Sequence, residues 1–169
     1  INSSVSPSLL RNLCFLQEVW STWKPREYKL IDIRADKESE LQRSPTARFA
    51  ISSFSGGVDS CYTVARHQFQ TLGRRQEKLT AGLMIHGLDI PLDNEIAFAA
   101  AAQKSQLILQ SVGMSLIKMT TNWRQVIKVP WEDGFGTAVA SSLMMLQGHF
   151  QVGLMASGQS YNNPRYPWG

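Results

Sequence analysis

Four apolar runs, separated by longer segments with a helical pattern, constrain the fold of this chain more than any other feature. The runs cover residues 48–54, 79–87, 114–122 and 150–158, and they are mainly apolar rather than strictly alternating. This pattern is typical of parallel strands that are buried on both faces. Strands that alternate with helices predict an α/β fold: an open, mostly parallel sheet with helices on both faces, in a Rossmann-like arrangement. Four buried helical segments are the alternative, which the shortness of the runs disfavours.

The segments between the runs have a helical pattern, and a glycine follows each of them. A glycine directly after a helix is expected in the left-handed conformation that caps the C-terminus. Asp93 is the predicted N-cap of the second helix. The predicted helices and their capping glycines are residues 59–72 with Gly73, residues 93–112 with Gly113 and residues 134–147 with Gly148.

Residues 1–47 lack this rhythm, and we interpret them as an N-terminal extension and linker. Residues 10–23 have the pattern of an amphipathic helix, and residues 28–33 could form an edge strand. The charged residues 34–44 are expected to form a solvated linker or helix face. The α/β domain is therefore predicted over residues 48–169, and we expect its sheet to continue past that range because doubly wound sheets commonly carry a fifth strand.

Composition limits the kinds of partner that the sequence predicts. No run approaches the roughly 18 apolar residues of a membrane span, and no signal-peptide pattern opens the chain. The two cysteines, Cys14 and Cys61, form no metal-binding spacing, so we expect a reduced, cytoplasmic protein without a membrane partner. The net charge of +4 suits an anionic ligand, but without a clustered basic face it does not predict a nucleic-acid partner. A homodimer is left open.

The stretch Ser-Gly-Gly-Val-Asp-Ser, at residues 55–60, lies where the first predicted strand meets the first predicted helix. Backbone N–H groups at a helix N-terminus attract anions, and the helix dipole adds to that attraction. Gly56 and Gly57 would let the backbone approach a phosphate closely, while Ser55 and Ser60 could add hydroxyl donors. The stretch therefore predicts a phosphate or pyrophosphate site, with a plain connecting turn of small residues as the alternative.

Asp59 distinguishes this turn from the commoner phosphate-binding loops. The dinucleotide fingerprint and the lysine-containing P-loop are both absent from the sequence. An acidic side chain would repel a triphosphate unless it caps the helix or holds Mg²⁺ that bridges the phosphates. Asp59 is therefore the candidate metal ligand.

Polar residues follow each of the four apolar runs. The carboxyl ends of parallel strands share one edge of the sheet, which is where ligands bind in such folds. Arg124 is the candidate phosphate clamp at this edge, with a surface salt bridge as the alternative. Residues 128–136 are expected to form a loop that closes over the site as a lid, or simply a surface loop. The remaining candidates at the edge are Ile85, His86, Gly87, Asp89, Thr121, Asn122, Ser157, Gly158 and Gln159.

The stretch SFSGGVDS resembles the signature of the ATP pyrophosphatase, or PP-loop, family, with all six motif positions matched at residues 55–60. The resemblance implies cofactors ATP and Mg²⁺, cleavage of ATP between the α and β phosphates, and adenylation of a substrate. It implies that the whole motif, Val58 included, holds pyrophosphate. It also implies that the backbone of Met84 and Ile85 reads adenine, with His86 near the ribose or base. Ser157 and Gly158 complete the implied nucleotide contacts.

Within that family, HGLDIPL and TNWR look similar to bacterial proteins grouped with cyano-deazaguanine synthase. This implies a ligase that adenylates a carboxylate or carbonyl oxygen for attack by a nitrogen nucleophile, with Asp59, Ser60 and Arg124 in catalytic roles. The synthase carries a cysteine-rich zinc site, whereas this chain has two cysteines. The alternatives are a nucleotide-binding module without turnover and sulfur transfer to RNA. The latter uses cysteine pairs, and Cys61 is expected to be a packing residue.

Overall fold

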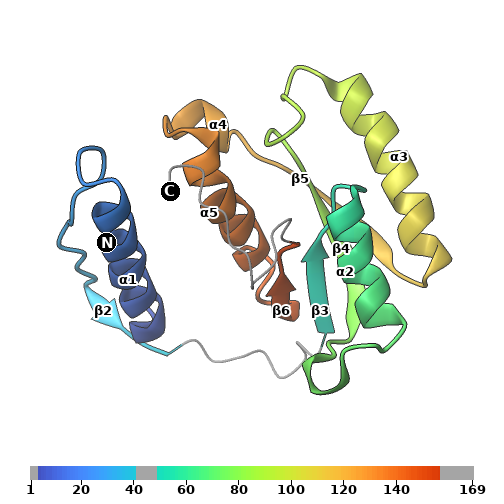
Figure 1. The fold of residues 1–169 in the computed structure, drawn as a ribbon, viewed down its shortest axis with the longest axis horizontal. Helices are drawn as coiled ribbons and strands as arrows, with labels where there is room; N and C mark the ends of the chain where they lie inside the picture. Colours follow the sequence, from blue (N-terminus) through green and yellow to red (C-terminus); the bar gives the residue numbers. More distant parts are fainter. Residues whose placement is uncertain (1–3, 41–48, 157–169) are drawn as a thin grey trace. The chain divides into compact units, whose positions relative to one another are not determined.

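The computed structural model describes residues 4–40 and 49–156. The chain divides into two compact units, residues 1–43 and 44–169, which are described separately here (Figure 1). This division lies close to the expected boundary between residues 47 and 48.

The first unit is built on α1, Pro7–Trp23, which confirms the predicted amphipathic helix. Ser6 caps this helix, because its hydroxyl accepts a hydrogen bond from the backbone N–H of Leu9 at 3.2 Å. A short β1, Ser4–Val5, pairs in parallel with β2, Lys37–Glu38. Of these two strands, β2 falls within residues 34–44, which the sequence assigned to a linker or helix face.

The edge strand expected over residues 28–33 does not form, so that prediction is wrong. A side chain of α1 provides the hydrogen bonds that a neighbouring strand would have made. Gln17 Oε1 accepts from the backbone N–H of Ile31 at 2.8 Å, and Gln17 Nε2 donates to the carbonyl of Ile31 at 3.0 Å. In this segment the Gln17 side chain thus takes both backbone hydrogen bonds of Ile31.

The second unit contains a sheet of four parallel strands among the described residues, which confirms the four predicted strands. Their order across the sheet is β5-β4-β3-β6. The first strand of the unit therefore lies in the middle, with the second and third on one side and the fourth on the other, as in a Rossmann-like sheet. The strands are β3, Phe49–Ser53; β4, Leu79–His86; β5, Ser115–Thr120; and β6, Phe150–Leu154.

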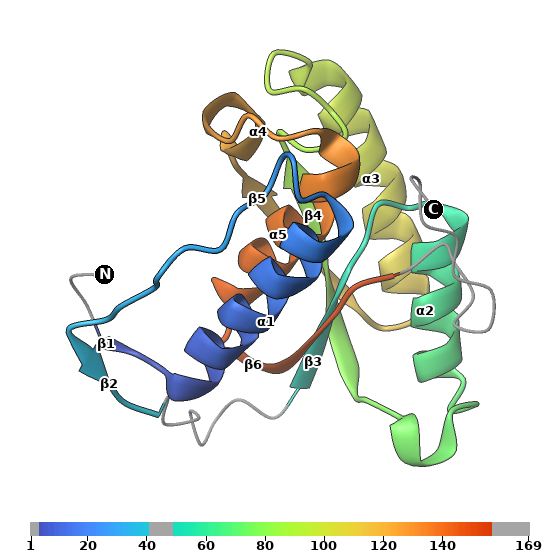
Figure 2. The same cartoon turned by 60° about the vertical axis from the view of Figure 1, so that its left-hand side comes forward.

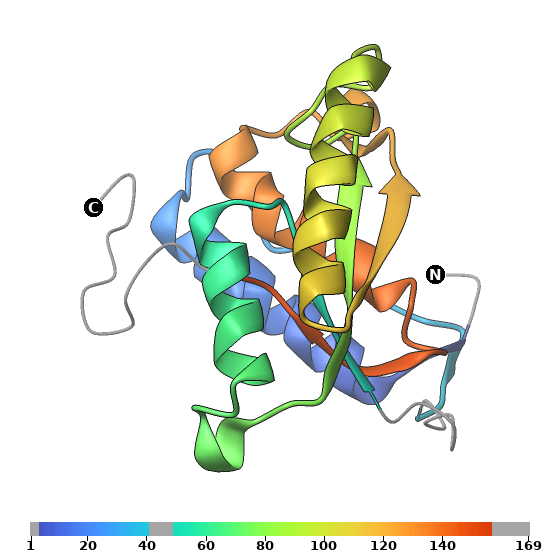
Figure 3. The ribbon, with the colours of Figure 1, turned by 90° about the vertical axis from the view of Figure 1, so that its right-hand side faces the viewer.

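Helices cover both faces of this sheet, as the apolar runs predicted. Two helices, α2 and α3, lie side by side on one face, and α5 lies on the other (Figures 2 and 3). Neighbouring residues of β3 serve different cores: Ala50 packs with α2 and α3, whereas Ile51 packs with α5. The helical elements are α2, Val58–Gln68; η1, Gly73–Arg75; α3, Glu95–Ser111; α4, Trp123–Val126; and α5, Trp131–Met144.

The ends of the helices agree only in part with the glycine pattern. Gly113 has φ +72° directly after α3, and the N–H of Met114 donates to the carbonyl of Leu109 at 2.9 Å, so this cap is confirmed. Asp93 is not the N-cap of α3: the side chain of Asn94 accepts from Ala97 N instead, at 3.2 Å.

The caps predicted at Gly73 and Gly148 are wrong. The helix predicted over residues 59–72 is α2, which ends at Gln68. Just after it, Thr71 N and Oγ1 both donate to the carbonyl of Arg66, at 3.2 and 3.1 Å. Gly73 instead begins the short η1. The helix predicted over residues 134–147 is α5, which ends at Met144. Hydrogen-bonded turns, not the helix, follow it and lead to Gly148.

The lid loop expected over residues 128–136 is also wrong, because α5 begins at Trp131. Glu132 and Asp133 lie in its first turn, where acidic side chains interact favourably with the helix dipole. Gly134, which suggested a loop, has a packing reason: a Cβ there would lie 2.4 Å from Cη2 of Trp123. The glycine lets the aromatic ring of α4 reach the backbone of α5.

We expect Gly134→Ala to lower the free energy of unfolding by about 1–3 kcal/mol, because the methyl group must displace the Trp123 ring. Gly136→Ala is the matched control in the same helix, since a Cβ there meets no atom within 4 Å. It should stabilise the protein by up to about 1 kcal/mol through helix propensity. Urea unfolding measures both. Equal stabilisation by the two substitutions would contradict the packing.

Candidate functional site

The glycine-rich turn between β3 and α2 has the geometry of an anion site. Gly56 has φ +78°, a conformation that favours glycine, and Ser55 Oγ accepts from Gly57 N at 3.3 Å. Gly57 is the N-cap of α2 and has no side chain to cap the first turn. The first-turn N–H groups, those of Val58, Asp59 and Ser60, have no acceptor four residues earlier within the helix. They remain available to a ligand at the end of α2.

Ser60 and Cys61 fix the turn through the backbone carbonyl of Gly57. Ser60 is buried, and its hydroxyl donates to the carbonyl of Gly57 at 2.9 Å. Cys61 N donates to the same carbonyl at 3.0 Å, and its side chain packs against the apolar cluster under α2 and α3. Cys61 is thus a packing residue, as expected.

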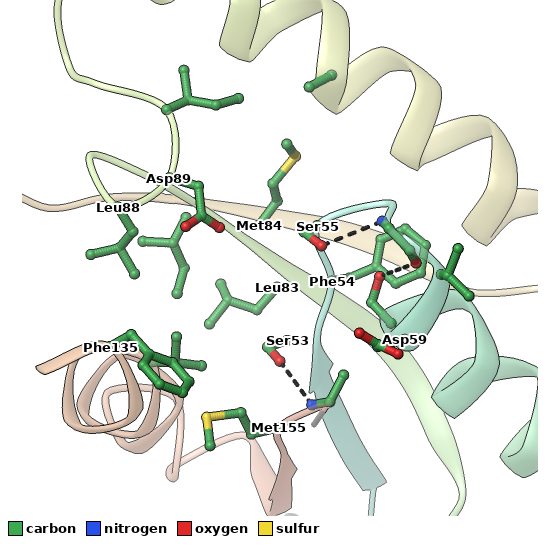
Figure 4. Close-up of a pocket in the computed structure, with 18 of the residues that line it drawn as sticks. Ser53, Phe54, Ser55, Asp59, Leu83, Met84, Leu88, Asp89, Phe135 and Met155 are labelled. Atoms are coloured by element: carbon green, nitrogen blue, oxygen red, sulfur yellow. Dashed lines mark hydrogen bonds between the residues drawn. The ribbon is translucent and has the colours of Figure 1, made fainter. Parts of the chain in front are cut away.

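A cleft of about 370 Å³ opens beside this turn, a volume typical of small-molecule sites (Figure 4). It lies at the carboxyl edge of the sheet, next to the place where β3 has β4 on one side and β6 on the other. That place is a topological switch point, where open α/β sheets bind their ligands. Five further segments share the lining with the turn: the end of β4, residues 88–90, Ala101 of α3, one face of α5 and residues 155–156.

The lining has a polar side and an apolar side. The turn supplies hydroxyl and backbone groups, whereas α5 supplies Trp131, Phe135 and Val139. Asp59 and Asp89 approach the cleft from different sides, and both are exposed (Figure 4). No Lys, Arg or His side chain is among the described residues that line it. An anionic ligand would have to be neutralised by backbone N–H groups and a bound cation.

Met84, Ile85 and Asp89, three of the residues expected at the sheet edge, line the cleft. His86 does not, although it belongs to the same strand. It is buried, its Nε2 lies 2.9 Å from the carbonyl oxygen of Pro91, and its ring stacks on Phe98 with centroids 4.3 Å apart. In this structure His86 anchors the segment after β4 to α3.

Arg124 is exposed and does not line the cleft, but it contacts two residues that do. Its Nη1 donates to the carbonyl of Leu88 at 2.9 Å, and its guanidinium lies 4.8 Å from the centroid of the Trp131 ring. Leu88 and Trp131 both line the cleft, so Arg124 connects two of its walls. Thr121 and Asn122 belong to the start of α4 and do not line it, while Ser157, Gly158 and Gln159 lie outside the described residues.

Sequence reasoning missed the helical form of the apolar wall: Trp131 and Phe135 lie in the segment expected to close over the site, but they belong to α5 and not to a loop. Trp131, Phe135 and Val139 recur every four residues and therefore share one helix face. This spacing is visible in the sequence, but the loop expectation for residues 128–136 concealed it. Sequence reasoning also did not predict that Ser53, Leu88 and Met155 line the cleft. Met155 lies in the last apolar run, and nothing in the local pattern marked it as a site residue.

Over residues 4–40 and 49–156, no three His, Cys, Asp or Glu side chains gather as a metal site. Mg²⁺ nevertheless often takes only one or two carboxylates together with phosphate oxygens, which Asp59 fits. No helix in the described part of the chain is long and apolar enough to cross a membrane. Comparisons of the chain with protein-family models, with curated proteins and with solved structures found no match.

We expect His86→Leu to lower the free energy of unfolding by about 1–3 kcal/mol, because it removes the partner of the Pro91 carbonyl and the stack on Phe98. His149→Leu, at an exposed position, is the control and should change it by less than about 0.5 kcal/mol. Thermal unfolding compares the two variants. Unchanged stability in His86→Leu would show that the histidine does not anchor the loop.

Proposed function

We propose that this protein is an ATP-dependent enzyme that forms AMP and pyrophosphate, of the ATP pyrophosphatase type. It would adenylate a carboxylate or carbonyl oxygen, which a nitrogen nucleophile then attacks. The observation that carries the proposal is the turn at residues 55–60, which brings the uncapped end of α2 to a cleft at the switch point of the sheet. A turn that merely joined a strand to a helix would not need to line the cleft.

The phosphate end of the nucleotide fits the turn. Gly56 and Gly57 leave the backbone uncovered, and the N–H groups of residues 58–60 point out of the first turn of α2. The helix dipole favours negative charge there. In this proposal the backbone binds the leaving pyrophosphate and stabilises the charge that develops on it.

The acidic lining supports a role for Mg²⁺. A triphosphate beside Asp59 and Asp89, with no basic side chain in the described lining, would be repelled unless a cation lies between them. Asp59, at the start of α2, would hold that ion, with phosphate oxygens and water as the other ligands. When bound, Mg²⁺ supplies Lewis-acid stabilisation of phosphoryl charge.

The adenine end fits the free edge of β4. The last residue of β3 pairs with Leu83, so β3 ends before it can pair with Ile85. Phe54 N donates to the carbonyl of Leu83 at 2.8 Å, and backbone groups of alternate residues in a strand point to the same side. The backbone of Ile85 therefore faces the cleft side, where it can hydrogen-bond the edge of a base. Met84 adds a buried apolar contact.

Arg124 is the proposed cationic contact to the nucleotide phosphates. One of its five N–H donors binds the carbonyl of Leu88, which leaves other donors for an anion. Its place over Trp131 limits the directions in which the guanidinium can turn. In this proposal the apolar face of α5 is left for the acceptor substrate.

We expect ATP·Mg²⁺ to bind the unaltered protein and to bind Asp59→Ala with Ser60→Ala at least about tenfold more weakly. Asp59 is the proposed metal ligand, Ser60 fixes the turn, and hydrogen bonds to charged groups contribute about 1.5–3 kcal/mol. Isothermal titration calorimetry measures both affinities. Asp93→Ala with Ser111→Ala, at exposed positions of the α3 region, is the matched control. No binding by the unaltered protein at millimolar ATP would contradict the proposal.

The second candidate function is a nucleotide-binding module without turnover. The lack of a basic side chain in the described lining favours it, because stabilising a transition state demands more positive charge than binding does. We expect release of AMP and pyrophosphate, in equal amounts, when carboxylate or amide acceptors are screened together with ammonium ions. A protein that binds ATP but yields neither product with any acceptor would instead be such a module.

A further inference from the structure

Basic side chains concentrate in one short stretch of the second unit, residues 66–78. This stretch carries Arg66, Arg74, Arg75 and Lys78 against a single acidic residue, Glu77. Its formal charge is therefore +3 with His67 neutral, compared with +4 for the entire chain. Arg74, Arg75 and Lys78 are exposed and make no ion pair with a described residue. Their charge is available to a partner.

Exposed aromatic rings lie along the helix that leads into this stretch. Tyr62, Arg66 and Phe69 recur at intervals of four and three residues and so share one face of α2. The side chains of Tyr62 and Phe69 are 60% and 69% exposed, although apolar rings on a helix surface are ordinarily turned toward a core. This face of α2 presents rings and a cation together.

Two of the cations lie over aromatic rings. The guanidinium of Arg66 is 5.5 Å from the centroid of Tyr62, and its Nη1 donates to the Tyr62 hydroxyl at 2.7 Å. Its buried Nε has no partner among the described residues. Lys78 Nζ lies 5.0 Å from the centroid of Phe49. Each pair offers a flat apolar surface and a positive charge within a few ångströms of one another.

We propose that this surface binds single-stranded nucleic acid. We name it the α2–η1 patch and define it by Tyr62, Arg66, Phe69, Arg74, Arg75 and Lys78. Proteins bind single strands by stacking bases on exposed aromatic rings and by neutralising the backbone phosphates with Lys and Arg. This patch combines both kinds of residue. The sequence alone predicted no nucleic-acid partner because it showed no clustered basic face; the exposed cations that follow the aromatic face of α2 are the reason to propose one now.

A lipid surface fits the patch less well. Membrane-surface helices bury a broad apolar face with cations at its margins, whereas here Arg66 lies on the ring of Tyr62 and Lys78 on that of Phe49. Rings covered by cations are poorly disposed to enter a bilayer. Stacking on a base remains open to the guanidinium plane of Arg66 itself and to the ring of Phe69, which is 69% exposed.

The basic end of the patch, at residues 74–78, is separate from the nucleotide cleft, whereas Tyr62 follows Ser60 of the cleft lining by two residues. The cleft lies at the N-terminal end of α2, whereas η1 follows its C-terminal end, and the 11 residues of α2, drawn in Figures 1 and 3, span about 16 Å. Binding at the patch therefore requires neither ATP nor Mg²⁺. Failure of the proposed enzymatic function would leave this inference unaffected.

The test is fluorescence anisotropy of a labelled 12-nucleotide oligothymidylate, titrated with the full chain in the absence of ATP and Mg²⁺. We expect Arg74→Ser with Arg75→Ser to weaken binding. The slope of log affinity against log salt concentration should fall by about 1.4, since each single-strand phosphate contact contributes about 0.7. Lys104→Ser with Lys118→Ser removes the same charge from exposed positions elsewhere and should leave the slope unchanged.

A second pair of variants tests stacking independently of charge. Phe69→Ala should weaken binding by about fivefold or more, the lower limit for loss of one stacked base. Phe15→Ala is its control, because the two phenylalanines are almost equally exposed, at 69% and 68%. Three results would each overturn the proposal: no binding by the unaltered chain at low salt, equal effects of patch and control variants, or binding to phosphatidylserine vesicles but not to the oligonucleotide.

Discussion

The central place of β3 is the constraint on which the second unit depends. This strand pairs in parallel with β4 on one side and β6 on the other, and the helices that lead into these two neighbours, α2 and α5, pack on opposite faces of the sheet. Its residues are therefore buried from both sides, with Ala50 and Ile51 in separate apolar clusters. Because the connections on the two sides of β3 run to opposite faces, they leave a crevice beyond the carboxyl end of this strand. The chain puts its glycine-rich turn at this crevice.

The chemistry of the crevice follows from what the turn lacks as much as from what it contains. Gly56 and Gly57 contribute no side chain, so the first-turn amides of α2 are reached directly. The nearby side chains are hydroxyls and carboxylates, and the described lining contains no basic residue. Backbone dipoles bind phosphate without a fixed cation, and a carboxylate beside them is compatible with phosphate when a divalent ion joins the two. The apolar face of α5 gives the opposite wall a different character, suited to an uncharged part of a ligand.

β3 and β4 were predictable from this sequence because burial on both faces leaves apolar runs that a local pattern can reveal, whereas no residue of β5 or β6 is buried and these two strands followed from the alternation of runs with helical segments. The ends and bounds of the helices were less predictable because individual side-chain contacts, which the hydrophobic pattern does not show, decide them. Thr71 ends α2 by bonding the carbonyl of Arg66, and Gly134 lies inside α5 to admit the ring of Trp123. The turn and Ile85 were placed at the site by their position at strand ends, whereas Met84 was expected there only because of the resemblance to the PP-loop family; all of them line the cleft. The stacking of His86 on Phe98 could not be foreseen, since it depends on how α3 packs on the sheet.

The most direct test of the central claim is a titration of the ¹⁵N-labelled protein with pyrophosphate in the presence of Mg²⁺, followed by amide NMR shifts. If the turn binds pyrophosphate through its backbone, the amides of residues 57–60 should shift most and saturate together. Asp59→Ala should weaken that response, while the amides of Arg74 and Arg75 at the other end of α2 should move little. Shifts confined to basic surface residues, with the turn unchanged at saturating pyrophosphate, would contradict the account.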